Sequence, residues 1–233
     1  MGGRFVLWDV DGTLLRTSGV AQRAFDVAAE HVLGRPAGDH EVRMSGKTDP
    51  LIALEILAFA GLDDEEARRL VPDVLAALEA ELAAAKDLVR EQGHVLPGVA
   101  EVLADLYEDP DVVQSVLTGN TAANAALKLQ AFGLDRWIDV EVGAFGSDRH
   151  DREELVPVAL ERVERLRGRT LEPGDVWVVG DTPRDLACAR AGGARCVLVA
   201  TGQFGIDELR DLKPDEVFAD LTDATAVARL LRS

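Results

Sequence analysis

A short apolar run near the N-terminus that ends in two aspartates constrains the fold more than any other feature. Residues 5–8 read FVLW, and a strand-forming run of this length is typical of a fully buried central strand. Asp9 and Asp11 follow it, and in extended chain their carboxylates point to the same side. Gly12 then allows a sharp turn. Like charges beside a buried strand end repel each other unless a cation or a shared proton relieves them, so a functional site is expected here.

The segment that follows, residues 16–95, carries helical patterns and no strand pattern. Apolar residues recur at spacings of three and four in stretches that glycine or proline separates: 20–33, 50–60 and 63–90. Pro72 is expected to kink the last of these helices or to split it in two. We therefore expect an all-helical insert between the first strand and the rest of the chain.

Beyond residue 97 the pattern alternates between strands and helices. Strands are expected at 112–117, 138–142, 176–179, 196–199 and from about 216, with helices between them. Such alternation indicates right-handed crossovers and a parallel sheet with helices on both faces. The predicted fold class is therefore α/β, a Rossmann-like core domain (1–15 and 96–233) with an inserted all-helical domain (16–95).

Composition and charge argue against several classes of partner. The 233 residues carry a formal net charge of −17, whereas a nucleic-acid partner requires a basic surface. No apolar run approaches the roughly 20 residues that span a bilayer, so no membrane association is expected. Cys188 and Cys196 are too few for a disulfide framework. We expect a cytoplasmic protein, as a monomer or a homodimer.

Polar residues follow three of the predicted strands. The carboxyl ends of parallel strands lie at one edge of the sheet, so these side chains are expected to converge on one crevice: Asp9 and Asp11, Thr118 and Asn120, and Asp181 and Asp185. Several carboxylates without histidine or cysteine favour Mg²⁺ over zinc. A hydroxyl group and unpaired backbone amides near a helix start suit an anion such as phosphate.

Three of these segments resemble motifs of a known superfamily. DVDGT (9–13), TGN (118–120) and GDTPRD (180–185) are similar to motifs one, two and four of the haloacid dehalogenase (HAD) superfamily. The helical insert resembles the cap of phosphoglycolate phosphatase-like members, and LPGV (96–99) resembles the segment by which such caps return to the core. The resemblance implies a Mg²⁺-dependent phosphatase of a small phosphorylated metabolite, acting through an aspartyl-phosphate intermediate.

The resemblance also implies roles for the four acidic residues. Asp9 would be the nucleophile and a metal ligand. Asp11 would be the general acid and base, and would bind the metal through its backbone carbonyl group. Asp181 would complete the metal site, with Asp185 as a further or supporting ligand. Metal and cationic side chains would neutralise the phosphoryl oxygens that a carboxylate nucleophile must approach.

The remaining motif positions are expected to bind substrate. Thr118 and the following amide, that of Gly119, would hold the phosphoryl oxygens by resemblance. Asn120 belongs to the same motif, and Gly12 and Thr13 to the first motif, so we assign them to substrate binding as well. The hydroxyl group of Thr13 adds a donor beside the aspartates.

Two cationic positions are assigned with less support from the motifs. The third motif of the superfamily normally supplies a lysine, but GSDRHDREELVP (146–157) has none. Arg152 is the preferred substitute, because arginine can hold phosphate bidentately, and Arg149 is its rival. Lys47, in the insert, lies in a loop that contacts substrate in related caps. It is expected to contact the leaving group.

Other functions stay open at this point. A sugar phosphomutase of the β-phosphoglucomutase type keeps both acids and the cap. A phosphonoacetaldehyde hydrolase-like activity would use a cap lysine such as Lys47 as a Schiff base, although those relatives usually carry alanine in place of Asp11. Asp11 also argues against a true dehalogenase. A non-catalytic binding module is the least favoured, since every acidic motif position is intact.

Overall fold

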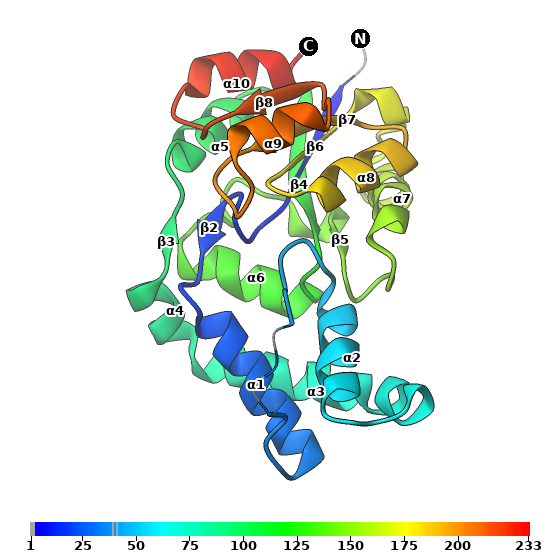
Figure 1. The fold of residues 1–233 in the computed structure, drawn as a ribbon. Coiled ribbons are helices and arrows are strands. Elements are labelled where there is room, and N and C mark those ends of the chain that lie inside the picture. Colours follow the sequence, from blue (N-terminus) through cyan, green and yellow to red (C-terminus); the bar gives the residue numbers. More distant parts are fainter. Residues whose placement is uncertain (1–2, 39, 41) are drawn as a thin grey trace.

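The computed structural model describes residues 3–38, 40 and 42–233, and within them a parallel sheet of six strands lies between two layers of helices (Figure 1). The strand order is β5-β4-β1-β6-β7-β8. The strands are β1 (Arg4–Trp8), β4 (Val112–Thr118), β5 (Ala144–Phe145), β6 (Val176–Gly180), β7 (Arg195–Val199) and β8 (Glu216–Phe218). The predicted α/β fold class is confirmed.

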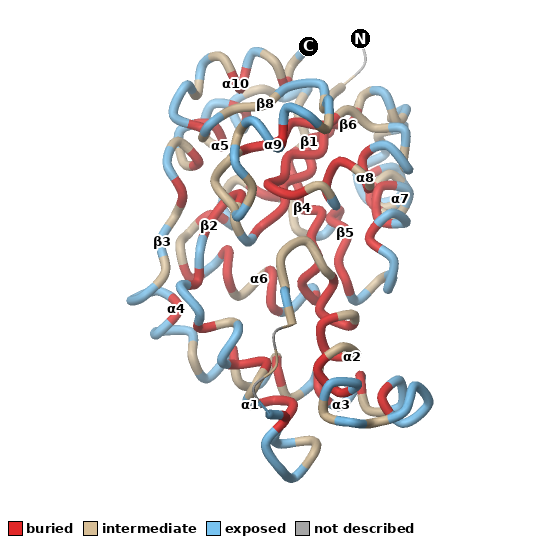
Figure 2. The backbone as a smooth tube through the Cα atoms, in the orientation of Figure 1, coloured by how far each residue is buried: buried red, intermediate tan, exposed pale blue. Residues whose placement is uncertain are grey.

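Strand β1 lies at the centre of the sheet, paired in parallel with β4 and β6, and alternates its side chains between the two helical layers. Phe5 and Leu7 face the layer of α7 (Leu155–Arg167), α8 (Pro183–Ala191) and α9 (Ile206–Asp211). Val6 and Trp8 face the layer of α5 (Val99–Tyr107), α6 (Ala122–Ala131) and α10 (Ala224–Leu231). All four side chains are fully buried, and Figure 2 shows β1 buried over most of its length.

The insert forms a second body of helices at the end of the molecule opposite both termini (Figure 1). Its helices are α1 (Val20–Leu33), α2 (Asp49–Phe59), α3 (Asp64–Ala84) and α4 (Lys86–Gln92). Their buried side chains form an apolar cluster of their own, which Leu127, Ala131 and Phe132 at the end of α6 complete. Helix α6 therefore packs on the sheet with one side and on the insert with the other.

A two-residue ribbon joins the insert to the sheet domain, which corrects the expectation that 16–95 holds no strand. Strand β2 (Leu15–Arg16) pairs in antiparallel fashion with β3 (His94–Val95). The chain leaves and re-enters the sheet domain at one place, so the two linkers satisfy each other's backbone groups. Two residues are too few to produce a visible period-two pattern.

One further expectation about local structure is wrong, and one alternative of another is excluded. Residues 138–142 do not form a strand: Val140–Val142 is a 3₁₀ turn, because the Asp139 carboxylate accepts a hydrogen bond from the Glu141 amide and caps it. The edge strand is β5 instead. Of the two alternatives for Pro72, the split is excluded, since helix α3 continues through this residue, whose side chain is exposed to solvent.

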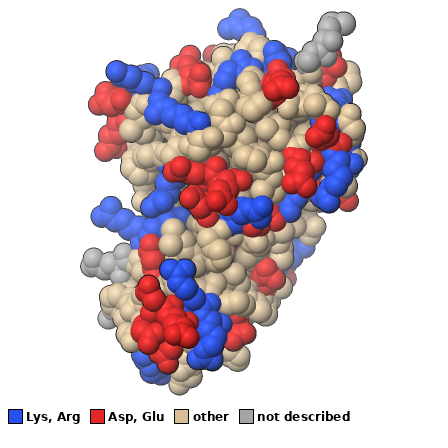
Figure 3. Space-filling view, turned by 90° about the vertical axis from the view of Figure 1, so that its right-hand side faces the viewer, with Lys and Arg blue, Asp and Glu red and all other residues tan. Residues whose placement is uncertain are grey.

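The surface carries charge of both signs. Figure 3 shows acidic and basic side chains interspersed over one face of both bodies, without a continuous basic area on that face. Among the described residues, no helix combines the length and the apolar character that crossing a membrane requires.

Candidate active site

Asp9 lies where β1 leaves the sheet, and its surroundings make ionisation costly. Its amide donates to the carbonyl oxygen of Val179 (2.8 Å), which holds the residue against β6. The side chain is almost completely buried. Burial raises the pKa of Asp9 to about 7, the nearby guanidinium of Arg152 opposes this rise, and repulsion from Asp185 adds to it.

Asp181 follows β6 and occupies a position that two glycines make possible. A Cβ atom on Gly202 would lie 1.7 Å from Oδ2 of Asp181, and one on Gly12 would lie 2.6 Å from it. Thr13 Oγ1 donates weakly to Asp181 Oδ1 (3.4 Å). Burial, followed by repulsion from neighbouring acids, raises the pKa of Asp181 to about 8. Gly202 was not identified from the sequence, because only the fold brings it to this carboxylate.

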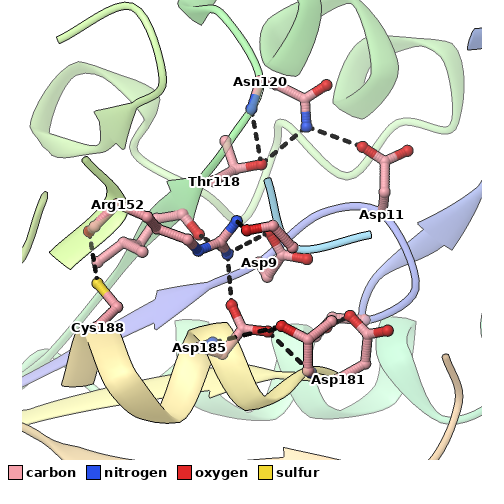
Figure 4. Close-up of polar contacts among 12 residues, drawn as sticks. Asp9, Asp11, Thr118, Asn120, Arg152, Asp181, Asp185 and Cys188 are labelled. Atoms are coloured by element: carbon pink, nitrogen blue, oxygen red, sulfur yellow. Dashed lines mark hydrogen bonds and ion pairs between the residues drawn. The ribbon is translucent and has the colours of Figure 1, made fainter. Parts of the chain in front are cut away.

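Arg152 joins two of the acids, as Figure 4 shows. Its Nη2 donates to Oδ1 of Asp9 (2.8 Å) and also to Oδ1 of Asp185. The other oxygen of Asp185 accepts from the amide (2.9 Å) and hydroxyl group (2.7 Å) of Thr182 at the start of α8. Both oxygens of Asp185 therefore already have donors, which favours a supporting position for this residue over direct metal ligation.

The rival cation, Arg149, lies outside this network. Its side chain is half exposed and pairs with Glu154 at 3.4 Å. Arg152, at 6% exposure, is the arginine that the fold places against the acid predicted to be the nucleophile. The choice between the two arginines rests on this placement.

The acidic cluster fits a divalent cation. Carboxylate oxygens of Asp9, Asp181 and Asp185 lie within 4.8 Å of one another, and all three side chains are buried. Three carboxylates face a single guanidinium, and their mutual repulsion adds to the larger effect of burial in raising the pKa values of Asp9 and Asp181. A set of hard oxygen donors suits Mg²⁺ better than a thiophilic metal. Asp9 and Asp181 are the members whose oxygens are least engaged by protein donors.

Asp11 turns its side chain away from the other acids, toward a residue that the sequence analysis missed. Its Oδ2 accepts from Nδ2 of Asn120 (2.8 Å) and from Nζ of Lys128 (2.6 Å). Lys128 also donates to Oδ1 of Asn120 (2.6 Å) and is buried. A signal was present: Lys128 lies three residues after Ala125 and four after Asn124, on the buried face of α6.

Thr118 ends β4 at the same edge of the sheet. Its Oγ1 accepts from the amide (3.3 Å) and from Nδ2 (2.8 Å) of Asn120, so the hydroxyl hydrogen points elsewhere (Figure 4). Gly119 packs against the insert, because a Cβ atom there would lie 1.9 Å from the carbonyl oxygen of Lys47. The TGN segment thus contacts both the acids and the insert.

The insert loop (residues 42–48, which precede α2) covers this edge of the sheet. The amide of Asp49, at the start of α2, donates to the carbonyl oxygen of Gly119 (2.7 Å). Thr48 Oγ1 donates to the carbonyl oxygen of His150 (3.1 Å). The ammonium group of Lys47 forms an ion pair with Glu55 of α2. Lys47 therefore lies at the site with its positive charge compensated by Glu55, another residue of the insert.

Asp49 fixes the insert to the sheet domain with its side chain. Its Oδ2 accepts from the amide of Thr121 (2.9 Å) and from Nδ2 of Asn124 (3.1 Å) at the start of α6. The carboxyl group is buried, and burial raises its pKa to about 6, partly offset by the charge of Lys128. Thr48 caps α2, so the Asp49 carboxylate is left for these contacts with α6.

A cavity of about 820 Å³ lies between the insert and the carboxyl edge of the sheet. The sheet domain lines it with most of the predicted site residues: Asp9, Asp11, Gly12, Thr118, Gly119, Asn120, Arg152 and Asp181. The insert lines it with polar and apolar side chains, among them Phe25, Met44 and Lys47. Thr13 and Asp185 are buried and do not line the cavity.

Comparison with known proteins gives consistent matches over the chain. Residues 6–190 match the family model of the haloacid dehalogenase-like hydrolases. A protein of Caldanaerobacter subterraneus subsp. tengcongensis, provisionally named pyrophosphatase PpaX, is 30% identical over 93% of this chain and 90% of its own. Phosphoglycolate phosphatase 1 of Pseudomonas aeruginosa is 29% identical, over 91% and 79%. A crystal structure described as a predicted phosphatase from Clostridium acetobutylicum superposes with a TM-score of 0.71 at 16% identity, over 98% of this chain and 100% of that one.

Proposed function

The chain belongs to the haloacid dehalogenase-like hydrolase family, and on that premise we propose that it is a Mg²⁺-dependent phosphatase that forms a phosphoryl intermediate on Asp9. Family membership and phosphatase relatives make it a phosphoric monoester hydrolase. The observation that supports phosphoryl transfer to Asp9 is the position of this residue. Its buried carboxylate lines the cavity, and one of its oxygens accepts a hydrogen bond from Arg152. The second oxygen is the nucleophile in this proposal.

In the first half of the reaction, an oxygen of Asp9 attacks the phosphorus atom of the ester. The bond between phosphorus and the ester oxygen breaks, and the carboxyl group of Asp11 gives its proton to that oxygen, so the alcohol leaves neutral. Arg152 holds the attacking carboxylate in place and offsets its charge. The hydroxyl group of Thr118 and the amide of Gly119 are assigned to the phosphoryl oxygens.

In the second half, water attacks the phosphorus atom of the aspartyl phosphate. Asp11, now a carboxylate, takes a proton from that water, and the bond between phosphorus and the Asp9 oxygen breaks. The products are inorganic phosphate and the original carboxylate of Asp9. Asp11 returns to its protonated state and is ready for the next ester.

Asp9, Asp181 and the backbone carbonyl group of Asp11 are the groups that would hold Mg²⁺. When bound, the ion supplies positive charge that offsets the phosphoryl oxygens and the buried carboxylates. Asp185 acts through Arg152, whose guanidinium it orients. The raised pKa values of Asp9 and Asp181 support this assignment: burial is their largest cause, repulsion among the acids adds to it, and a bound cation relieves that repulsion.

The substrate we propose is a small phosphorylated metabolite, and the insert (16–95) is proposed to act as the cap over a core of 1–15 and 96–233. The relatives' names, a pyrophosphatase and a phosphoglycolate phosphatase, support a small anionic substrate. The cavity has room for more than a phosphoryl group and lies under the insert loop. A cytoplasmic location and a monomeric or homodimeric state stay predictions.

The experiment that tests this function measures phosphate release from a panel of phosphorylated metabolites, pyrophosphate and an aryl phosphate, with Mg²⁺ and with a chelator. We expect metal-dependent release from at least one small ester. Conversion of a sugar phosphate to its isomer without net phosphate release would instead identify a mutase. Absence of turnover of every compound, the aryl phosphate included, would contradict the proposal and favour a binding module.

A further inference from the structure

Lys128 is a buried cation that the proposed reaction leaves without an assignment. Its side chain is 3% exposed and extends from α6 to the carboxyl group of Asp11 in the first motif. Burial of a lysine ammonium is costly unless anionic or polar partners compensate it. Lys128 has such partners in Asp11 and Asn120, both at 2.6 Å.

Lys128, Asn120 and Asp11 form a closed ring of hydrogen bonds. Lys128 donates to Asp11 and to the side-chain oxygen of Asn120, and Asn120 donates in turn to Asp11. Both donors reach the same carboxyl oxygen, Oδ2. Across the part of the chain that the structure describes, no protein donor is recorded for Oδ1, and the side chain of Asp11 lines the cavity at 41% exposure.

We propose that Lys128 is a positioning residue for the acid-base step, and that it holds Oδ2 of Asp11 so that the transferable proton lies on Oδ1, facing the substrate. Two donors on one carboxyl oxygen leave no place for a proton there, because a protonated oxygen is itself a donor. The proton must then lie on the other oxygen. This inference rests on the proposed function, in which Asp11 protonates the leaving oxygen.

The two buried cations of the site therefore assist different parts of the proposed reaction. Arg152 contacts Asp9 and Asp185, so its loss would impair attack on any phosphate ester. Lys128 contacts Asp11, so its loss matters where the leaving oxygen needs a proton. The alkoxide released from an alkyl phosphate needs that proton, whereas the nitrophenolate released from a nitrophenyl phosphate is a stable anion without it.

The test compares kcat/KM of Lys128→Met on an alkyl phosphate that the enzyme accepts and on p-nitrophenyl phosphate. The constant kcat/KM reports the transition state of the first irreversible step, and so excludes the later attack by water that both esters share. We expect the alkyl-to-aryl ratio of kcat/KM to fall by about tenfold or more. Inhibition by inorganic phosphate is expected to stay as in the wild type, since the phosphoryl contacts are intact.

Three controls make the result specific. Lys86→Met removes an exposed lysine of the insert and is expected to leave the ratio unchanged. Lys128→Arg keeps a cation and is expected to restore part of the ratio. In an Asp11→Asn background, Lys128→Met is expected to lower alkyl turnover no further, because its effect passes through Asp11. Turnover of the aryl ester by Lys128→Met reports that the variant is folded.

An equal loss of kcat/KM on both esters, a total loss included, would overturn the inference, since it would place Lys128 on the phosphoryl group or in the general structure. Additive effects of Lys128→Met and Asp11→Asn would also overturn it. Failure of the wild type to release phosphate from either ester contradicts the proposed function itself. The wild-type measurement therefore separates the two failures.

Discussion

The effect of Asp181 on the stability of the protein should reveal whether this residue binds a cation. Its carboxyl group is buried between two glycines and beside other acids, and its pKa is raised from 3.8 to about 8. A carboxyl group with a raised pKa stabilises the fold while protonated, and that contribution is lost as pH rises through the folded-state value. Without metal, Asp181 therefore destabilises the protein progressively between about pH 4 and pH 8.

We predict from this that Asp181→Asn unfolds at a higher temperature than the wild type above about pH 8 in the presence of a chelator. With Mg²⁺ the wild type is expected to gain at least about 3 °C, and the variant to gain little, because the ion binds only the native carboxylates. Thermal unfolding followed by circular dichroism measures both. A wild type that is insensitive to Mg²⁺ would argue against metal binding by this cluster.

Arg152 and Arg149 give a matched pair of arginines within one segment. Arg152→Met would leave the buried carboxylates of Asp9 and Asp185 without their cation, which typically costs about 3–5 kcal/mol of unfolding free energy. Arg149 is half exposed, so Arg149→Met is expected to change the unfolding free energy by less than about 0.5 kcal/mol.

Denaturant unfolding measures these differences, and Arg152→Lys adds a kinetic test. Lysine keeps the charge but not the planar guanidinium, so stability is expected to fall less and phosphate release to fall by about 10²-fold or more. Equal effects of the two methionine variants on stability would contradict the placement of Arg152 at the centre of the acidic cluster.

At the scale of elements, the contact between the insert and α6 depends on Asp49. Its pKa is raised from 3.8 to about 6 by burial, so its contribution to stability is greatest below about pH 4 and is lost as pH rises through about 6. Asp49→Asn is neutral at every pH and can accept the same two hydrogen bonds, from Thr121 and Asn124.

We therefore predict that Asp49→Asn is more stable than the wild type by about 1–3 kcal/mol above about pH 7, and that this advantage disappears near pH 4. Denaturant unfolding across this range measures the difference. Asp73→Asn, on the exposed side of α3, is the control and is expected to show no such trend. A pH-independent difference for Asp49→Asn would contradict the sign of this argument.

A second prediction at the scale of elements concerns the close contact between the insert loop and the TGN segment. A Cβ atom on Gly119 would lie 1.9 Å from the backbone oxygen of Lys47, and no side-chain rotation can relieve that contact. Gly119→Ala is expected to displace the insert loop and to lower kcat/KM by about tenfold or more. Gly174→Ala meets nothing within 4 Å and serves as the matched control. Unchanged kinetics in Gly119→Ala would show that the loop does not have to close on this segment.

The sequence predicted the elements of the site better than their contacts. The ends of parallel strands share one edge, so the placement of Asp9, Thr118 and Asp181 in one crevice followed from the alternation of strands and helices. Lys128 and Gly202 were missed because their partners lie far away in the sequence. The helical pattern of α6 places Lys128 on the buried face, but it does not identify Asp11 as the partner, and no local pattern brings Gly202 to Asp181.

Errors in the predicted elements have the same origin. The alternating apolar residues at 138–142 are typical of a strand, yet the Asp139 side chain caps a turn there and pairs with Arg167 of α7. The ribbon of β2 and β3 was too short to leave a pattern. In each case a tertiary contact decided the local conformation.

At the scale of the whole molecule, the chain is strongly acidic, yet several of its cationic side chains lie together where an anionic substrate would bind. The net charge is −17, but Lys47, Arg152 and Lys128 all line the cavity. Exposed charges beyond about 8 Å are largely screened at physiological salt, so the local charge of the cavity matters more than the total. Helix α6 packs on the sheet and on the insert alike, and thereby joins both parts of the cavity wall.

The central claim, covalent transfer of the phosphoryl group to Asp9, is tested most directly by intact mass measurement after rapid acid quenching with an aryl phosphate and Mg²⁺. Asp11→Asn should accumulate the intermediate, because the aryl ester needs no proton and the later attack by water lacks its base. We predict a species one phosphoryl group heavier, with the group mapped to Asp9, and its absence in Asp9→Asn. A phosphoryl group on another residue, or phosphate release retained by Asp9→Asn, would contradict the account.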